Sequence, residues 1–131
     1  MESSAGKSQR VFKTAWFSKA AAKALISDNE LCSAIRQVMQ GQCDDLGGGV
    51  YKKRLSKNLA RSIILAKGGR YWVYAYLFAK KDRANIDKQD LENLRALAEV
   101  YARKTEADIA AELHHKKIVE ICHDQQTQIP Q

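Results

Sequence analysis

The sequence predicts an α+β domain built on a small antiparallel sheet, and three observations support this. Strand-like segments follow one another in the middle of the chain, short turns separate them, and segments with helical periodicity lie before and after them. The predicted order is one strand, two helices, three strands and one or two further helices. Strands and helices grouped in this way are typical of α+β folds, and 131 residues suffice for one domain with a single core.

The amino-terminal part is predicted to form a short strand and two helices. Val11–Thr14 alternates in polarity, which suits a strand, and Ala15–Ile26 is alanine-rich with an apolar face. Ser27 and Glu30 fit a capping box, in which each side chain satisfies a free backbone amide of the other residue, at the start of a second helix. That helix is expected to end before Gly41. Its inner stripe comprises Leu31, Ile35, Val38 and Met39.

A loop and three strands are predicted next. Asp44–Gly49 ends in three glycines, which permit a tight entry into a strand. The alternative, a phosphate-binding loop, is disfavoured because no Lys-Ser/Thr pair and no helix follow. The strands are expected at Val50–Ser56, Arg61–Ala66 and Tyr71–Ala79, with a hairpin turn at Lys67–Arg70. The last strand is apolar on both faces, which indicates a central strand covered by helices on at least one side.

Strict alternation divides the side chains of this last strand between the two faces of the sheet. The aromatic residues suit either a core or a platform on which RNA bases stack, and the accompanying Val73 and Leu77 favour the core. The set predicted for one face is Trp72, Tyr74, Tyr76 and Phe78. The set predicted for the other is Tyr71, Val73, Ala75 and Leu77.

The carboxyl-terminal part is predicted to be helical. Asp87 can cap one helix, and Thr105 followed by Asp108 can begin a second. We therefore expect residues 104–131 to form a C-terminal helical extension and tail. The apolar positions of the two helices are Leu91, Leu94, Leu97, Ala98 and Tyr101, then Ile109, Leu113, Ile118 and Ile121.

Composition bounds the setting of the protein. No apolar run approaches the length needed to cross a membrane, and Met1–Gln9 is polar without a hydrophobic signal core. We expect residues 1–9 to be a disordered leader and the protein to stay in the cytoplasm. The three cysteines, Cys32, Cys43 and Cys122, are odd in number and widely spaced, which argues against a disulfide framework and fits a reducing compartment.

Most of the positive charge lies in the predicted strands. Between Val50 and Arg83 the chain has ten Lys/Arg and a single acid, Asp82, whereas the remainder has twelve bases and fourteen acids. Exposed lysines also solubilise strands and protect sheet edges, but that role does not explain one acid among eleven charged residues. Bases gathered on one rigid sheet produce the focused positive field that a phosphate polymer needs. Nucleic acid, with RNA considered first, is therefore the expected partner.

Several segments, in the order of these elements, carry a family resemblance. They are Val11–Lys19, Asp45–Val50, Tyr51–Leu55, Arg61 and Phe78–Arg83. Together they resemble the RelE/HigB toxins of bacterial type II toxin–antitoxin systems, over about residues 10–103. The resemblance implies a RelE/ParE-like domain across those residues.

The resemblance also implies an activity and partners. It implies a small mRNA interferase, an endoribonuclease without metal or cofactor, that enters the ribosomal A site, cuts the message and arrests growth. It implies a cognate antitoxin protein as partner and operator DNA as a target of the toxin–antitoxin complex. Two other functions stay open on the same fold: a ParE-like poison of DNA gyrase, and a non-catalytic relative that binds only an antitoxin or operator DNA.

The family's basic positions fall on the strands of this sequence. Matched residue by residue, the basic pair of the family's second strand falls on Lys52 and Arg54, and the arginine of its third strand falls on Arg61. The basic cluster after the last strand falls on Lys80, Lys81 and Arg83. This chain departs from the pattern in two ways near the site, because Lys57–Ala60 is a shortened loop and Asp87 stands where relatives have a tyrosine.

RNA cleavage without a metal needs a base for the 2′-OH, charge stabilisation of the phosphorane and an acid for the leaving group. No histidine lies among residues 1–113, so Lys52 is the candidate base, and nearby cations such as Lys53 favour its neutral form. Arg54 and Arg61 would bind the scissile phosphate through their planar guanidinium groups. The candidates that stabilise the leaving group are Lys81 and Arg83. The expected RNA-binding residues are Tyr51, Lys53, Lys57 and Lys80.

Overall fold

The computed structural model describes residues 9–67, 70–83 and 85–122 and builds them into six strands and four helices. The strands are β1 (Arg10–Thr14), β2 (Asp44–Gly47), β3 (Val50–Leu55), β4 (Ala60–Lys67), β5 (Tyr71–Ala79) and β6 (Ile118–Ile121). The helices are α1 (Ala15–Lys23), α2 (Asp28–Met39), α3 (Lys88–Ala102) and α4 (Glu106–His114). Residues 1–8 of the expected leader, the glycines of the turn predicted at Lys67–Arg70 and residues 123–131 of the expected tail lie outside the described residues.

The two amino-terminal helices begin where the sequence pattern places them. The Thr14 hydroxyl accepts a hydrogen bond from the Phe17 N–H at the start of α1, and the Ser27 hydroxyl accepts one from the Glu30 N–H at 3.2 Å at the start of α2. The second half of the predicted capping box is wrong, because the Glu30 carboxylate accepts a hydrogen bond from the backbone N–H of Ser56. This contact ties α2 to the turn between β3 and β4.

The segment predicted as a loop, Asp44–Gly49, is instead a strand followed by a tight turn. β2 pairs antiparallel with β3, with Gly47 opposite Val50, so that Gly48 and Gly49 form a two-residue hairpin turn. Both have positive φ, 67° and 82°, which a type I′ turn needs and glycine adopts without steric cost. The hairpin adds a strand beyond the basic strand β3.

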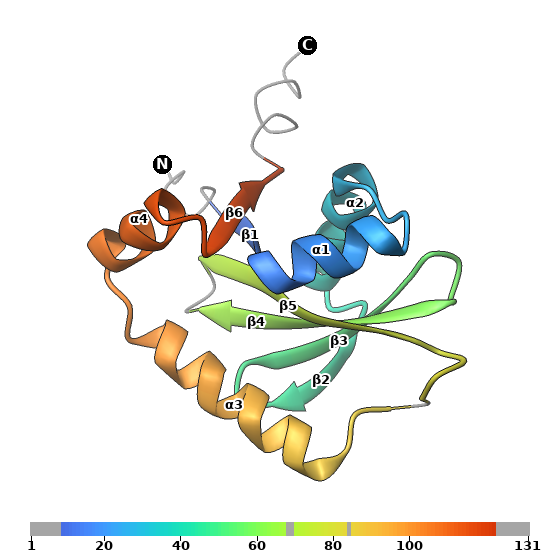
Figure 1. The fold of residues 1–131 in the computed structure, drawn as a ribbon. Helices are drawn as coiled ribbons and strands as arrows, with labels where there is room; N and C mark the ends of the chain where they lie inside the picture. The colour runs from blue at the N-terminus through green and yellow to red at the C-terminus, as the bar shows by residue number, and fades with distance from the viewer. Residues whose placement is uncertain (1–8, 68–69, 84, 123–131) are drawn as a thin grey trace.

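The six strands form one sheet in the order β2-β3-β4-β5-β1-β6. All neighbouring pairs are antiparallel except β1 and β5, which run parallel. Helices α1 and α2 lie on one face of the sheet and α3 lies on the other (Figure 1). The α+β class and the predicted strands β3, β4 and β5 are therefore confirmed.

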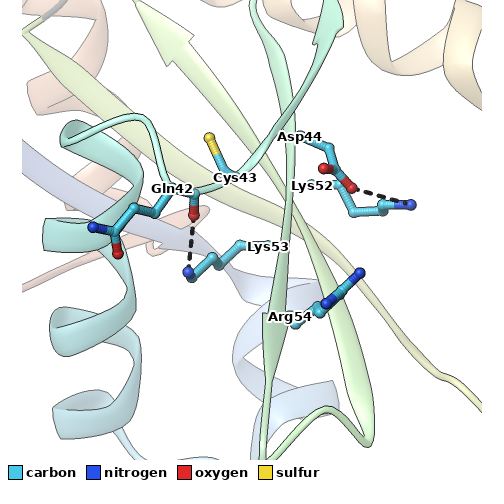
Figure 2. Close-up of a pocket in the computed structure, with 6 residues that line it drawn as sticks. All are labelled: Gln42, Cys43, Asp44, Lys52, Lys53 and Arg54. Atoms are coloured by element: carbon cyan, nitrogen blue, oxygen red, sulfur yellow. Dashed lines mark hydrogen bonds and ion pairs between the residues drawn. The ribbon is translucent and has the colours of Figure 1, made fainter.

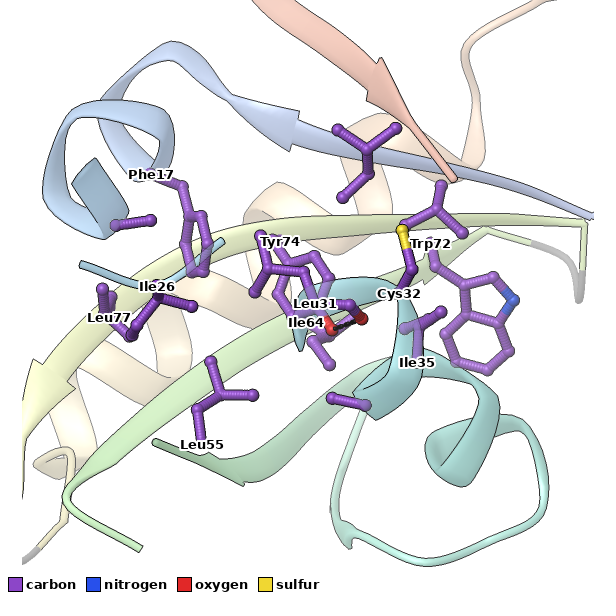
Figure 3. Close-up of a cluster of buried hydrophobic side chains, with 14 of the residues drawn as sticks. Phe17, Ile26, Leu31, Cys32, Ile35, Leu55, Ile64, Trp72, Tyr74 and Leu77 are labelled. Carbon is purple, nitrogen blue, oxygen red and sulfur yellow. Dashed lines mark hydrogen bonds between the residues drawn. The ribbon is translucent and has the colours of Figure 1, made fainter. Parts of the chain in front are cut away.

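Each face of the sheet has its own hydrophobic cluster. Under α1 and α2, the side chains of Phe17, Leu31 and Tyr74 are fully buried, and the Tyr74 hydroxyl donates a hydrogen bond of 2.7 Å to the Leu31 carbonyl (Figure 3). The cluster under α3 and α4 includes Phe12, Val50, Ile63, Leu65, Tyr71, Val73, Ile109 and Ile118. The strands of the sheet centre are apolar on both sides for this reason.

A β-bulge at Ala75 breaks the predicted alternation of β5. Tyr74 and Tyr76 pair with consecutive residues of β4, which leaves Ala75 as the extra residue. Beyond the bulge, Tyr76 and Phe78 pack with the cluster under α3, and Leu77 packs with the cluster under α1 and α2. The predicted grouping of four aromatic residues on one face is therefore wrong, because the bulge turns the last two to the opposite side.

The carboxyl-terminal residues are helical only in part. Thr105 and Asp108 form the predicted capping box at the start of α4. Ile118–Ile121, predicted as helical, is instead strand β6, which pairs antiparallel with β1. The guanidinium of Arg10 donates two hydrogen bonds of 2.8 and 2.9 Å to the Glu120 carboxylate across this pair. The extension thus completes the sheet.

A disulfide bond joins Cys32 of α2 to Cys122, the residue after β6. The expectation that the cysteines are unpaired is wrong for these two, because β6 carries Cys122 back across the sheet to α2. Cys43 is the free cysteine among the described residues.

Within residues 9–67, 70–83 and 85–122, none of the helices has the length and apolar character needed to cross a membrane.

Candidate functional site

The α3 face of the central strands is built of three rows of side chains that run across β3, β4 and β5. The row Val50–Leu65–Val73 is buried beneath α3 and is here named the covered end. The next row is Lys52–Ile63–Tyr76, and the last is Arg54–Arg61–Phe78; these two rows together are named the basic end. The three basic side chains predicted for catalysis on β3 and β4 therefore share one face, in the two rows that follow the covered end.

Arg54 and Arg61 lie directly opposite each other on neighbouring antiparallel strands. Side chains in that position approach to about 5 Å, and like charges there destabilise a sheet. Arg54 is exposed and makes no hydrogen bond or ion pair with any residue that the structure describes. Arg61 is only 7% exposed, and its Nη1 donates to the carbonyls of Asn58 at 3.0 Å and Ala60 at 3.3 Å. The pair therefore lacks a counter-anion among the residues that the structure describes and is suited to receive one.

The turn before Arg61 is held in an unusual conformation. Ser56, Lys57 and Asn58 have positive φ of 54°, 54° and 74°, a region that costs about 1–2 kcal/mol per residue for side chains other than glycine. The Glu30 carboxylate holds the Ser56 amide on one side, and Arg61 holds the Asn58 carbonyl on the other. These contacts fix the guanidinium of Arg61 and leave Lys57 exposed in the turn.

Lys52 is held between two partners that the sequence did not indicate. Its Nζ lies 3.5 Å from the Asp44 carboxylate of β2 and donates a hydrogen bond of 3.3 Å to the Asn85 side-chain oxygen. The side chain of Lys52 is 14% exposed. The β2–β3 hairpin is responsible, since it sets Asp44 opposite Lys52 in the register. A phosphate that binds Lys52 has to compete with this carboxylate.

Arg83 reaches the basic end from the segment after β5. Its Nη2 lies 3.0 Å from the Asp90 carboxylate, and its Nη1 donates to the Tyr76 hydroxyl at 3.2 Å. The guanidinium carbon lies 5.6 Å from the ring centroid of Phe78, within the range of a cation–π contact. The hydrogen bond with Asp90 raises the pKa of Arg83 above its ordinary value. Arg83 is therefore a fixed positive charge beside the row that holds Arg54 and Arg61.

Two of the predicted RNA-binding residues lie on the other face of the sheet. Tyr51 is half-buried against Trp72, with ring centroids 5.8 Å apart, and this burial raises the pKa of the Tyr51 hydroxyl. Lys53 extends away from Lys52 and Arg54 and donates a hydrogen bond of 2.9 Å to the Gln42 carbonyl, beside a small hollow at the sheet edge (Figure 2). The structure does not bring Tyr51 together with the basic end, whereas Lys53 lines this hollow together with Lys52 and Arg54.

Lys80 and Lys81 are exposed after the end of β5. Neither side chain makes an ion pair or hydrogen bond with any residue in the described part of the chain. The backbone N–H of Lys80 donates to the Leu59 carbonyl at 2.9 Å, so the segment lies beside the turn that precedes Arg61. Both lysines are available to an incoming polyanion at that edge of the basic end.

Sequence reasoning missed Tyr76 and Phe78 as members of this face. Their place depends on the bulge at Ala75, and the alternation of apolar residues in β5 carries no sign of it. Asn85 was missed because it belongs to a segment without periodicity. The sequence signal for these residues was the number of aromatic side chains in β5, and that number indicated a hydrophobic core.

The family model described as the RelE toxin of the RelE/RelB toxin–antitoxin system matches residues 9–121. The chain belongs to this RelE toxin family. The match includes α4 and β6, beyond residue 103 where the resemblance read from the sequence ended. No curated protein and no solved structure matches the chain. As a RelE-family toxin, the protein has an antitoxin as its partner.

Proposed function

We propose that this RelE-family toxin is a metal-independent endoribonuclease that cuts mRNA on the ribosome and so inhibits translation. The observation that carries the proposal is the pair Arg54 and Arg61, which lie opposite each other and beside Lys52 on one face of the sheet. A cross-strand arginine pair without an ion-pair partner among the described residues suits one phosphate group, since a guanidinium fork can bind two phosphate oxygens. The family resemblance supports the ribosome as the place of action.

The proposed reaction is attack of a 2′-OH on the neighbouring phosphorus. The O2′–P bond forms, the P–O5′ bond breaks, and the products are a 2′,3′-cyclic phosphate and a 5′-OH. Lys52 is the proposed base that accepts the proton of the 2′-OH, and Arg54 and Arg61 stabilise the charge that develops on the phosphorane. Asn85 orients the Lys52 amine through the hydrogen bond at 3.3 Å.

The leaving 5′-oxygen needs a proton and a positive charge nearby. Arg83 supplies the charge and not the proton, because its hydrogen bond with Asp90 raises its pKa. Lys81, exposed and two residues away in the same segment, is the proposed proton donor. Lys57 and Lys80 hold RNA backbone on the rim, while Tyr51 and Lys53 lie on the opposite face and take no part in cutting.

The proposal extends to the partners and the setting. The protein acts in the cytoplasm, its antitoxin neutralises it, and the toxin–antitoxin complex binds its own operator DNA. Each of these statements follows the family resemblance, and the basic end provides the surface that an acidic antitoxin segment can cover.

Inducible expression in a bacterial host tests the proposal. The wild-type protein is compared with the double variant Lys52→Ala, Arg54→Ala, and primer extension maps the 5′ ends on a translated message. We expect growth arrest and in-frame cuts with the wild type and neither with the double variant. The matched control is Arg103→Ala, Lys117→Ala, which removes two exposed cations remote from the basic end and should leave arrest and cuts unchanged.

Normal growth with intact message in cells that express the wild type contradicts the nuclease proposal. Relaxation of plasmid supercoiling or gyrase-dependent DNA breaks in those cells would point to the gyrase poison. If plasmid supercoiling and DNA are unchanged but the protein binds an antitoxin, the result would point to the non-catalytic relative.

A further inference from the structure

A groove lies between α1 and the carboxyl-terminal half of β5, next to the basic end. Its volume is about 690 Å³. It exists because β1 pairs only with Tyr71–Tyr74 of β5 and then turns into α1 at Ala15. From Ala75 onward, that side of β5 faces α1 and has no strand partner within the described residues. The groove is lined by Trp16, Ala20, Tyr76, Leu77, Phe78 and Arg83, with Lys19 and Lys23 among the other lining residues.

Three aromatic rings form a continuous series along the groove. The ring of Trp16 stacks on Tyr76 with centroids 5.1 Å apart and an interplanar angle of 26°, and Tyr76 lies 5.9 Å from Phe78. Trp16 is 51% exposed, although the next residue, Phe17, is fully buried. A tryptophan ring that is stacked on one side and open to solvent on the other can accept one more flat group.

Three cations and one acid are among the described residues that line the groove, and one of the cations, Arg83, is ion-paired with Asp87 and Asp90. Lys19 and Lys23 lie three and seven residues after Trp16, so they share its stripe on α1 and line the groove with it. Arg83 lines the far wall, and the acid among the lining residues is Asp82. Apolar rings bordered by cations suit a ligand that has flat bases on a phosphate backbone.

The groove is continuous with the basic end. Phe78 belongs to the same cross-strand row as Arg54 and Arg61, and two strand spacings of about 4.8 Å separate β3 from β5. Arg83 contacts both Tyr76 and Phe78, so it belongs to the groove and to the basic end. A strand of RNA whose phosphate lies at Arg54 and Arg61 therefore needs to extend only about 10 Å across the sheet to reach Phe78, which lines the groove.

We propose that this groove is a base-binding subsite for single-stranded RNA. A base flanking the phosphate at Arg54 and Arg61 stacks on Trp16, and Lys19 and Lys23 hold the backbone beyond it. The bulge at Ala75 serves this subsite, since it turns Tyr76 to the side where it supports the indole ring. The inference rests on the proposed function for its substrate class and adds the position and chemistry of a neighbouring nucleotide.

Binding of an uncleavable RNA tests the subsite. The probe is a short single-stranded oligonucleotide with 2′-O-methyl riboses, which removes the attacking hydroxyl, and a second probe has the same backbone with abasic positions. Affinity is measured by fluorescence anisotropy for the wild type, Trp16→Ala and Trp16→Phe. Loss of one base–aromatic stack should weaken binding of the normal probe to Trp16→Ala by about 5- to 150-fold. Trp16→Phe should retain most of the affinity, and the abasic probe should bind wild type and Trp16→Ala alike.

Two further measurements keep the inference independent of folding and of cleavage. Circular dichroism checks that Trp16→Ala folds, and the double variant Lys19→Gln, Lys23→Gln should lower the salt dependence of binding without removing the preference for bases over abasic positions. Equal binding of both probes by the wild type, with no effect of Trp16→Ala, overturns the subsite and leaves the groove to a protein partner.

The failures of the two proposals are distinguishable. If the protein cleaves mRNA in cells but Trp16→Ala does not change probe binding, the nuclease proposal stands and the subsite proposal fails. If probe binding depends on bases and on Trp16 but no mRNA is cut in cells, the subsite proposal stands and the nuclease proposal fails.

Discussion

The covered end and the basic end are two parts of one sheet face that differ in their side chains and in what lies over them. At the covered end, Val50, Leu65 and Val73 are 0–1% exposed beneath α3. Four residues farther along the same strands, Arg54 and Arg61 stand opposite each other without a counter-charge among the described residues. The strands supply equivalent positions in both places, so the reach of α3 decides which of them becomes core and which becomes a site.

The largest effect is expected from a truncation at the covered end. Leu65→Ala removes a fully buried side chain and should lower the free energy of unfolding by about 2–5 kcal/mol. Denaturant unfolding measures the change. The matched variant at the basic end, Arg54→Gln, should change stability by less than about 1 kcal/mol and in the stabilising direction, because it removes a like-charge contact. A large loss of stability in Arg54→Gln would contradict the division of the face into core and site.

The same arginine should dominate activity. Arg54→Gln is expected to lower the cleavage rate by about 100- to 1,000-fold, the usual cost of removing one group that stabilises developing charge. Cleavage is measured on a message during translation in vitro. Arg103→Gln, which removes an equal charge from an exposed position, should leave the rate within about twofold if local charge and not net charge matters.

An anion should stabilise the basic end. Inorganic phosphate at ten times its dissociation constant should raise the stability of the wild type by about 1.4 kcal/mol, because phosphate binds the folded state only. Thermal unfolding at matched ionic strength, with chloride in place of phosphate, isolates this effect. Arg54→Gln should lose it, and an equal response of both proteins would place the anion elsewhere.

The smallest effect concerns the carboxylate beside Lys52. Asp44→Asn removes an ion pair at 3.5 Å that is partly open to solvent, so stability should change by less than about 0.5 kcal/mol. Affinity for the uncleavable RNA probe should rise by about two- to fivefold, since Lys52 no longer has a competing anion. Unchanged affinity would mean that Lys52 does not contact the RNA.

The sequence predicted those parts of the fold that depend on local chemistry. The caps at Asp87 and Thr105 are present as predicted, because a side chain near its own helix start needs no distant partner. β5 was predicted as central because it is apolar on both faces. Local reasoning failed for Ile118–Ile121, whose apolar spacing fits a helix but which pairs with β1, more than 100 residues away. Hydrogen bonding to the open edge of β1 outweighs the local preference of this segment for a helix.

In the site too, features that depend on local pattern could be predicted and features that depend on distant contacts could not. Alternation along β3 places Lys52 and Arg54 on one face, and the register between β3 and β4 adds Arg61 to that face. The positions of Tyr76 and Phe78 could not be predicted, since a bulge is decided by the packing of both layers and not by β5 alone. The disulfide bond between Cys32 and Cys122 could not be predicted for a related reason, because it depends on where β6 joins the sheet.

The pairing of β1 with β6 has a consequence for how the toxin is made. Val11, near the start of the chain, pairs with Ile121, and the chain grows by about 5–20 residues per second during synthesis. A nascent chain that ends at α3 presents β1 with its outer edge bare, and closing such a distant pair is a slow step of folding. Completion of the six-stranded sheet therefore waits until Ile121 has been synthesised and β6 can pair with β1.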